Sequence, residues 1–167
     1  MVASESTTAQ LDRDTAIGYV EPMRRMAVIV VLLFVSLTAW GDIYEWETNL
    51  EAAKEQAAQQ DKHVFLYFAG SDWCGWCQRL TEEVVETRPF REFAEDNLVR
   101  VLIDFPRERE ISQEQQQYNR ELAEEFGVEG FPTIFLLAPD GEVVLQTGYR
   151  RGGPANYVSH LKNSMEE

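Results

Sequence analysis

The sequence contains few of the residues that build a metal centre or a disulfide framework. Its 167 residues include only two cysteines, Cys74 and Cys77, and two histidines, His63 and His160. A disulfide between cysteines separated by two residues closes a very short loop, so it restricts the unfolded chain little and cannot staple a fold. Half a zinc site would need further ligands, and neither histidine belongs to a ligand motif. We therefore expect no metal site and a local role for the two cysteines.

A clustered basic face is also absent. The chain has 15 lysines and arginines against 29 aspartates and glutamates, which gives a formal net charge of -14. A protein that binds a polyanion needs a concentrated basic surface, so the charge excludes nucleic acid as a partner. The acidic residues are spread over stretches with helical periodicity, which indicates a solvated surface. With 44% hydrophobic residues the chain can nevertheless bury the core of one domain.

No apolar run reaches the roughly 20 residues that span a bilayer comfortably. The longest one, residues 27–40, follows two arginines and ends beside Gly41. A positive segment, a short apolar segment and small residues at its end are typical of a secretory signal peptide. We place this signal peptide at residues 23–41 and expect an exported, periplasmic protein. A membrane-anchored form that keeps the segment is the alternative.

The polar segment of residues 1–22 fits the signal pattern poorly. It carries four acidic residues ahead of the two arginines, and it shows no hydrophobic periodicity. Signal peptides seldom follow so long an acidic segment. We interpret this N-terminal extension as an artefact of an upstream start, with translation beginning at Met23, and we assign the folded domain to residues 42–167.

Helical periodicity and apolar runs predict alternating helices and strands in that domain. The segment 63–69 is a nearly continuous run of β-branched and aromatic residues, which is typical of a strand buried on both faces. Residues 139–141 form a strong hairpin turn between the last two strands. We predict strands at 63–69, 98–105, 133–138 and 142–147, and helices at 47–60, 77–86, 90–96, 111–126 and 155–162.

The order of these elements predicts an α/β fold with a central mixed β-sheet flanked by helices. Parallel crossover connections come first, and an antiparallel hairpin follows at the edge of the sheet. Pro89 is expected to interrupt the helical stretch near residue 88. Leu80, Val84 and Val85 have the spacing of side chains that face the core.

The chemistry is expected at Cys74 and Cys77. Cys74 follows a buried strand and a short loop, and Cys77 lies on the helix that begins there. Free backbone N–H groups and the helix dipole at such a position favour an anion, which lowers the pKa of a thiol and activates its thiolate. Cys77, one helical turn further, can then resolve a mixed disulfide. A merely structural disulfide and buried, inert thiols are the competing interpretations.

Two motifs carry a resemblance to the thioredoxin superfamily. The first is Trp-Cys-Gly-Trp-Cys at residues 73–77, and the second is Gly-Val-Glu-Gly-Phe-Pro-Thr at residues 127–133. The resemblance extends from Val64 to Lys162. The longer segment around the first motif, residues 69–77, resembles exported bacterial thioredoxin-like proteins more closely than it resembles cytoplasmic thioredoxin. It implies a thioredoxin-like fold for the domain of residues 42–167.

The resemblance also implies substrate-binding residues around the cysteines. Pro132 would be a cis-proline that faces the disulfide, and the backbone of Phe131 would pair with an extended substrate segment. An ordinary trans-proline at a strand start is the alternative. Trp73, Gly75 and Trp76 would complete the substrate surface. We expect Trp76 to be a partly exposed apolar pad, whereas Trp73 could equally serve core packing.

Two departures from thioredoxin leave the direction of electron flow open. The resemblance implies a buried carboxylate on the strand before the motif, but the likeliest equivalent position is Tyr67, a poor base near neutrality with a reference pKa of about 10. The middle pair is Gly75 and Trp76 rather than glycine and proline, so thioredoxin's reducing potential cannot be assumed. Asp72 is interpreted as a loop or capping residue.

We therefore predict a monomeric thiol–disulfide oxidoreductase that acts on protein or peptide disulfides, with the reductase direction weakly favoured. It needs no dissociable cofactor, because its electrons reside in the dithiol, but it needs a membrane or soluble redox partner to reset it. The alternative from another class is a peptide-binding or chaperone-like module in which the two cysteines are ancillary. A peroxide-reducing enzyme ranks lower, because it would want one low-pKa cysteine in its own pocket.

Overall fold

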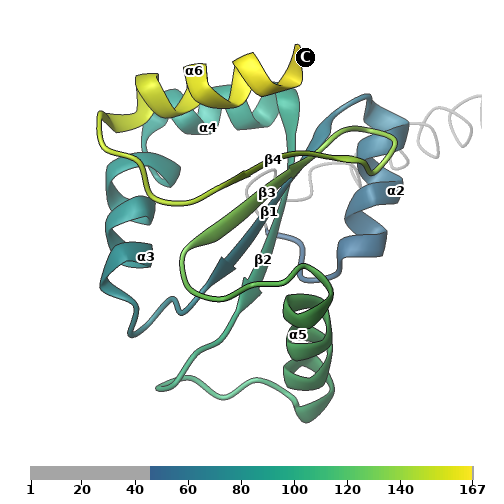
Figure 1. Ribbon diagram of the computed structural model, residues 1–167, viewed down its shortest axis with the longest axis vertical. Helices are drawn as coiled ribbons and strands as arrows, with labels where there is room; N and C mark the ends of the chain where they lie inside the picture. Colours follow the sequence, from purple (N-terminus) through teal and green to yellow (C-terminus); the bar gives the residue numbers. More distant parts are fainter. Residues whose placement is uncertain (1–45, 167) are drawn as a thin grey trace, which may run out of the picture. The chain divides into compact units, whose positions relative to one another are not determined.

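The computed structural model describes residues 46–166. Both the N-terminal extension (1–22) and the signal peptide (23–41) that we predict lie outside the described residues. The elements are α2 (Leu50–Gln60), β1 (His63–Ala69), α3 (Gly75–Leu80), the π-helix η1 (Thr81–Val85), α4 (Arg88–Asn97), β2 (Leu98–Asp104), α5 (Gln113–Glu125), β3 (Thr133–Leu137), β4 (Val143–Thr147) and α6 (Gly153–Met165) (Figure 1). Together they form the predicted α/β fold, a mixed sheet with helices around it.

The four strands of the sheet lie in the order β2-β1-β3-β4. Strands β1 and β2 are parallel, with His63 opposite Leu98 and Ala69 opposite Asp104. Strand β3 is antiparallel to both β1 and β4, and the turn at residues 139–141 joins β3 to β4 as predicted. The sheet is thus mixed, with antiparallel β4 at one edge.

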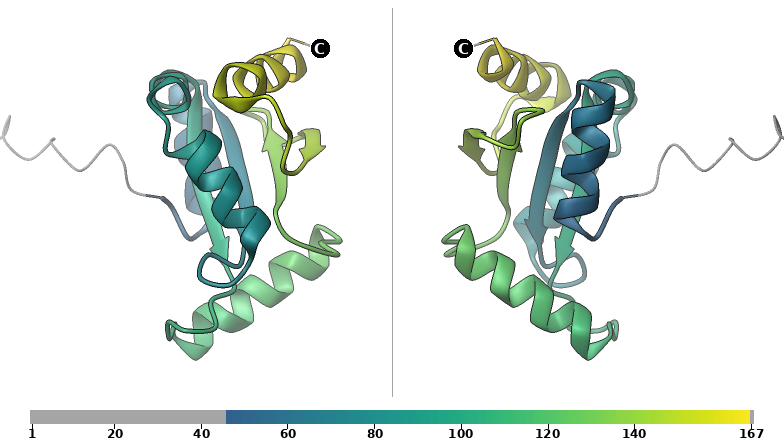
Figure 2. Two further views of the ribbon diagram at one scale, coloured as in Figure 1. Left: turned by 90° about the vertical axis from the view of Figure 1, so that its left-hand side faces the viewer. Right: turned by 90° about the vertical axis from the view of Figure 1, so that its right-hand side faces the viewer.

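The predicted parallel crossover is present between β1 and β2, but the prediction was wrong for the connection from β2 to β3, because β3 is antiparallel to β1. Helix α5 lies at the end of the sheet where β1 and β2 finish (Figure 1, Figure 2). It therefore does not carry the chain back to the opposite end. Strand β3 starts at this same end, with Thr133 opposite Phe68, and runs back along β1.

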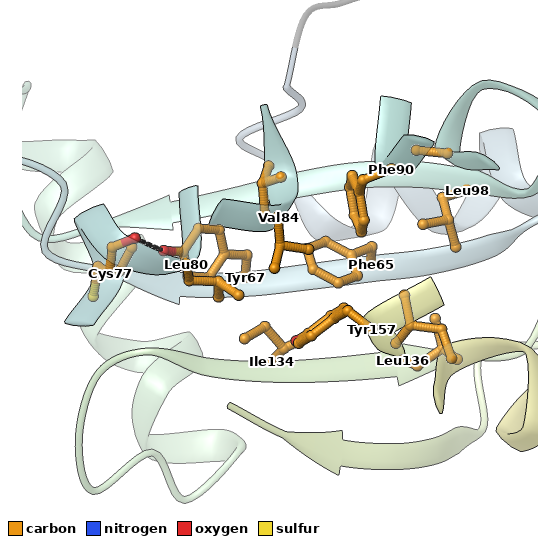
Figure 3. Close-up of a cluster of buried hydrophobic side chains, with 14 of the residues drawn as sticks. Phe65, Tyr67, Cys77, Leu80, Val84, Phe90, Leu98, Ile134, Leu136 and Tyr157 are labelled. Carbon is orange, nitrogen blue, oxygen red and sulfur yellow. Dashed lines mark hydrogen bonds between the residues drawn. The ribbon is translucent and has the colours of Figure 1, made fainter. Parts of the chain in front are cut away.

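Successive side chains of β1 enter two different hydrophobic clusters, one on each face of the sheet. One cluster collects Phe65, Tyr67 and Ala69 with side chains of α3, η1, α4 and α6, and Figure 3 shows its centre. The other collects Val64, Leu66 and Phe68 with side chains of α2 and α5. Six of the seven residues of β1 are buried, as predicted. Burial of each large side chain contributes roughly 1.5–3 kcal/mol, so β1 is the centre of the core.

The predicted helix 77–86 begins earlier than expected and changes its winding. It starts at Gly75 as α3 and continues as η1, whose turn closes with a 2.9 Å hydrogen bond from the Glu86 N–H to the Thr81 carbonyl. Side chains predicted to face the core are buried: Leu80, Val84 and Val85. Pro89 does not interrupt a helix but lies in the first turn of α4, where its missing N–H removes no intrahelical hydrogen bond.

Helix α2 begins three residues later than predicted. Asn49 caps it, because its side chain accepts a 2.9 Å hydrogen bond from the Ala52 N–H. Glu47, which was expected in the helix, instead forms a bridge with Val101 of β2. Within residues 46–166, no helix combines the length and the apolar character needed to cross a membrane.

Candidate active site

Cys74 and Cys77 are joined by a disulfide at the start of α3, with their Cα atoms 5.2 Å apart. Cys74 is the N-cap residue of this helix, and its Sγ accepts a 3.2 Å hydrogen bond from the Cys77 N–H. Cys74 is 8% exposed and Cys77 only 1%. The two sulfurs therefore differ in accessibility, and Cys74 is the one that another molecule can reach.

The loop between β1 and α3 is held by a buried carboxylate at the end of β2. Asp104 accepts hydrogen bonds from the N–H of Ser71 at 2.9 Å and from its hydroxyl at 2.6 Å. The guanidinium of Arg109 forms an ion pair with the same carboxylate at 2.8 Å. On the α5 side, the Asn119 amide donates a 2.7 Å hydrogen bond to the Asp104 carbonyl. The buried carboxylate therefore has its hydrogen-bond partners, as buried polar groups generally require.

Asp72 connects this loop to the segment that follows β2. Its carboxylate accepts hydrogen bonds from the backbone N–H groups of Arg107, Glu108 and Arg109, with shortest distances of 3.0, 2.7 and 3.3 Å. Partial desolvation acts to raise the pKa of Asp72, but these N–H groups outweigh it and hold the pKa below its usual value. Asp72 is therefore a loop residue that ties two loops together, which agrees with the loop role expected from the sequence.

The indole of Trp73 is fixed beside the disulfide. Its Nε1–H donates a 2.7 Å hydrogen bond to the Phe105 carbonyl, and the edge of its ring meets Phe131 with 6.0 Å between centroids. The guanidinium of Arg107 lies 3.7 Å from the ring centroid. A Cβ atom at Gly70 would overlap three atoms of the indole, so glycine there makes room for it. Trp73 is still 37% exposed, so it combines packing with an accessible surface.

Trp76, between the two cysteines in the sequence, is 51% exposed, which agrees with the partial exposure expected for it. Its ring contacts Tyr149, with 5.2 Å between centroids, and the Arg79 guanidinium lies 5.2 Å from the Trp76 ring centroid. The Tyr149 hydroxyl in turn donates a 2.6 Å hydrogen bond to Glu83. Trp76 therefore packs against Tyr149 and Arg79, while about half of its surface is exposed to solvent.

The segment before β3 faces the disulfide. The peptide bond between Phe131 and Pro132 is cis, and the Phe131 carbonyl oxygen lies 3.6 Å from Cys74 Sγ. The Phe131 ring stacks on Phe105, with 5.0 Å between centroids. A Cβ atom at Gly148 would lie 2.9 Å from the Pro132 carbonyl oxygen, so the chain after β4 passes close behind this proline. The fold thus brings together the two motifs, in which Cys74 and Phe131 are 57 positions apart in the sequence.

Tyr67 is part of the buried core and contacts the first turn of α3. Its hydroxyl donates a 3.2 Å hydrogen bond to the Cys77 carbonyl (Figure 3). Burial raises the pKa of Tyr67 to about 12, although its hydrogen bond with the Thr81 side chain acts in the opposite sense. Tyr67 is therefore a neutral donor at physiological pH. No cluster of three or more metal-ligating side chains occurs in the part of the chain that the structure describes.

Sequence reasoning missed four residues that shape the site: Asp104, Phe105, Arg107 and Tyr149. A signal for the first three was present. Because β1 and β2 are parallel, the residues that follow β2 lie beside the residues that follow β1, at the edge where α/β proteins place their ligands. No comparable signal was present for Tyr149, since its position depends on the path of the chain after β4.

Comparison with known proteins agrees with this geometry. The sequence profile of the family described as thioredoxin-like domain matches residues 50–162. Disulfide bond reductase DsbH of Chlamydia pneumoniae is 35% identical over 122 residues, covering 73% of this chain and 73% of that protein. A solved structure titled DsbH Oxidoreductase has a TM-score of 0.68 at 35% identity, covering 73% of this chain and 84% of that one. A Thermus thermophilus thioredoxin shares the fold, with a TM-score of 0.53 and 22% identity, over 71% of this chain and 85% of that one.

The fold and the bonded cysteine pair define the class of this protein as a thiol–disulfide oxidoreductase. The chain belongs to the thioredoxin-like domain family. Among the proteins compared, it is similar to DsbH over most of the described domain.

Proposed function

We propose that this protein reduces disulfides of exported proteins by thiol–disulfide exchange. The observation that carries the proposal is the Cys74–Cys77 disulfide at a helix start, bordered by the exposed rings of Trp73 and Trp76. The similarity to a protein named disulfide bond reductase favours the reductase direction.

Cys74 is the nucleophile in this proposal. It is the more exposed of the two sulfurs, and the Cys77 N–H that points at its Sγ would stabilise a thiolate. The Cys74 thiolate attacks one sulfur of the substrate disulfide. A mixed disulfide forms, and the other substrate sulfur leaves as a thiolate and takes up a proton.

Cys77 then completes the transfer. Its thiolate attacks Cys74 Sγ, the Cys74–Cys77 disulfide forms, and the second substrate sulfur leaves as a thiol after protonation. Two electrons have passed from the protein dithiol to the substrate. A membrane or soluble partner with a dithiol of its own must then reduce the Cys74–Cys77 disulfide to restore the active form.

The substrate lies along the surface formed by Trp73, Gly75, Trp76, Phe131 and Pro132. An extended segment pairs with the main chain at Phe131, whose carbonyl lies 3.6 Å from Cys74 Sγ, and such pairing does not demand a particular sequence. No heavy atom lies within 4 Å of the position that a Cβ at Gly75 would occupy, so a substrate backbone can approach there. The two tryptophans offer apolar contact on either side.

The decisive experiment is insulin-disulfide reduction by the Cys74→Ser variant with dithiothreitol as electron donor. We expect the rate to fall to that of dithiothreitol alone. Full activity of this variant would refute the assignment of Cys74. A variant with both cysteines changed to serine separates the alternative, because a peptide-binding or chaperone-like module would keep its function, including suppression of aggregation, without them.

The compartment and the domain limits are part of the proposal. Residues 23–41 are a signal peptide, residues 42–167 are the mature thioredoxin-like domain acting as a monomer, and residues 1–22 are not translated. The positive, apolar and small-residue segments described above support this division. Mass spectrometry of protein from its native host tests it: the expected N-terminus is Asp42, and peptides from residues 1–22 would contradict the assigned start.

A further inference from the structure

Arg107 is a cation held over the indole of Trp73, the residue that precedes the proposed nucleophile Cys74. Its guanidinium lies 3.7 Å from the centroid of the Trp73 ring, and that ring is itself fixed by its hydrogen bond to Phe105. The backbone N–H of Arg107 donates to the Asp72 carboxylate at 3.0 Å, which ties the arginine to the loop that leads to Cys74. The position of Arg107 is thus set by the same contacts that form the active-site loop.

This cation has no carboxylate partner of its own. In residues 46–166, no ion pair involves Arg107, although the chain carries 29 acidic residues. Two carboxylates of the neighbouring loops have other partners: Asp72 accepts three backbone N–H groups, one of them from Arg107 itself, and Asp104 pairs with Arg109. Arg107 is exposed, so the edge of its guanidinium is open to a ligand while one face rests on the indole.

The other tryptophan beside the disulfide differs in this respect. The guanidinium of Arg79 lies over Trp76, but it also forms an ion pair with Glu83 at 3.3 Å. Arg79 therefore has a carboxylate partner within the protein. Arg107 differs from Arg79 in that no ion pair within residues 46–166 engages its guanidinium.

We propose that Arg107 binds a carboxylate of the substrate, so that the protein prefers disulfides whose cysteine has an aspartate or glutamate nearby. This inference rests on the proposed function and names the substrate chemistry of the same site. A guanidinium offers paired N–H donors to a carboxylate, and stacking on an aromatic ring leaves these donors free. The net charge of -14 repels acidic substrates at long range, and a local cation counters that repulsion at the point of contact.

The test uses three peptides that differ only beside a single cysteine. The cysteine of each peptide is in a disulfide with 2-mercaptoethanol. The two residues that lie two positions before and after it are both aspartate in the first peptide, both glutamine in the second and both lysine in the third. The second-order rate constant of each with the fully reduced protein is measured by mass spectrometry of quenched samples. In the Arg107→Gln variant, the ratio of the aspartate-peptide rate to the lysine-peptide rate should fall about two- to fivefold, the range of an exposed ion pair.

Two further variants make the result specific. Arg88→Gln removes the same charge on α4, where Arg88 pairs with Glu92, and it should leave the ratio at the wild-type value. Arg107→Lys keeps the charge and should restore part of the preference. Salt at about 500 mM should shrink the difference between wild type and Arg107→Gln, because exposed charges are screened.

The results that would contradict this inference can be distinguished from those that would contradict the proposed function. An equal ratio in the two glutamine variants, or an equal slowing of all three peptides by Arg107→Gln, would overturn the inference and leave the proposed function standing. A wild-type protein that reacts with none of the peptides at a rate above that of free cysteine would contradict the proposed function as well.

Discussion

The hydroxyl of Tyr67 donates a hydrogen bond across 3.2 Å to the backbone carbonyl of Cys77. This contact joins the middle of β1 to the first turn of α3, which carries the resolving cysteine of the proposed mechanism. The Cys77 carbonyl also accepts from the Thr81 N–H, so Tyr67 is a second donor to the same oxygen. Because its pKa is raised to about 12, Tyr67 orients the turn and does not remove a proton from Cys77 at neutral pH.

We predict that Tyr67→Phe lowers the free energy of unfolding by about 0.5–1.5 kcal/mol at pH 7, the usual contribution of one hydrogen bond. Above pH 10 the stability advantage of the wild type over Tyr67→Phe should shrink. Unfolded Tyr67 ionises near its reference pKa of about 10, whereas the folded residue ionises only near 12, so the wild type loses stability across this window. Urea titrations at intervals between pH 7 and pH 12 measure this.

The Tyr67→Phe variant should lose less stability than the wild type as the pH rises from 10 to about 12, by up to about 2–3 kcal/mol. It will not become fully insensitive to pH, because burial also raises the pKa of Tyr157. Parallel stability curves for the two proteins through this window would contradict the assignment. The pH dependence of disulfide exchange between pH 6 and 9 should keep its shape, because Tyr67 stays protonated there.

The strand β1 and the cysteine motif were predictable because their signals are local. The run from His63 to Ala69 has one interpretation, since every side chain in it suits a buried strand, and its limits were predicted to the residue. The same holds for the turn at residues 139–141, where proline, aspartate and glycine favour a hairpin. Sequence alone was sufficient wherever neighbouring residues decide the conformation.

The rest of the site depends on contacts between distant segments. Nothing near Thr81 indicates that the helix widens to a π-helix there, and nothing near Thr133 indicates that β3 runs antiparallel to β1. Arg107 belongs to the site because the parallel strands end together, so its role follows from the register of β1 and β2 rather than from its own neighbours. Long-range packing, which periodicity does not report, decides these features.

The unequal exposure of the two sulfurs leads to a trapping prediction. In a Cys77→Ser variant, Cys74 can still attack a substrate, but no thiolate remains to release it. The variant should accumulate mixed disulfides with reduction-sensitive protein substrates, visible on a non-reducing gel and abolished by dithiothreitol. The Cys74→Ser variant is the matched control and should trap little. Stronger trapping by Cys74→Ser would reverse the roles assigned to the two cysteines.

The packing of Trp73 on Gly70 leads to a steric prediction. In Gly70→Ala, the new Cβ overlaps the indole, which must move and lose its hydrogen bond to the Phe105 carbonyl. We expect a loss of about 1–3 kcal/mol in the free energy of unfolding, typical of overpacking. Hydrogen exchange of the Trp73 indole N–H, followed by NMR, should become faster.

The control for this variant is Gly130→Ala. No heavy atom lies within 4 Å of the Cβ position at Gly130, and its backbone does not require glycine, so its stability should stay within about 0.5 kcal/mol of the wild type. Equal stability of the Gly70 and Gly130 variants would show that the indole relocates without cost, which the geometry does not predict.

The carboxylate of Asp72 should make the active-site loop sensitive to acid. Since three backbone N–H groups hold its pKa below the usual value, the unfolded chain binds a proton at Asp72 at higher pH than the folded protein does. The stabilisation is therefore fully present above about pH 4 and is lost as the pH falls through the lower pKa of the folded state. Asp72→Asn should be less stable than the wild type at pH 7, and the difference should shrink below about pH 4.

Unfolding by urea at pH 7, 5, 4 and 3 measures this dependence, and Glu55→Gln serves as the control. Glu55 is an exposed carboxylate on α2, so the same change of charge there should alter the free energy of unfolding by less than about 0.5 kcal/mol at pH 7. A difference between wild type and Asp72→Asn that stays constant down to pH 3 would mean that the charge of Asp72 is not what holds the loop. Because Arg107 depends on the same hydrogen bonds, Asp72→Asn should also weaken the preference for acidic peptides.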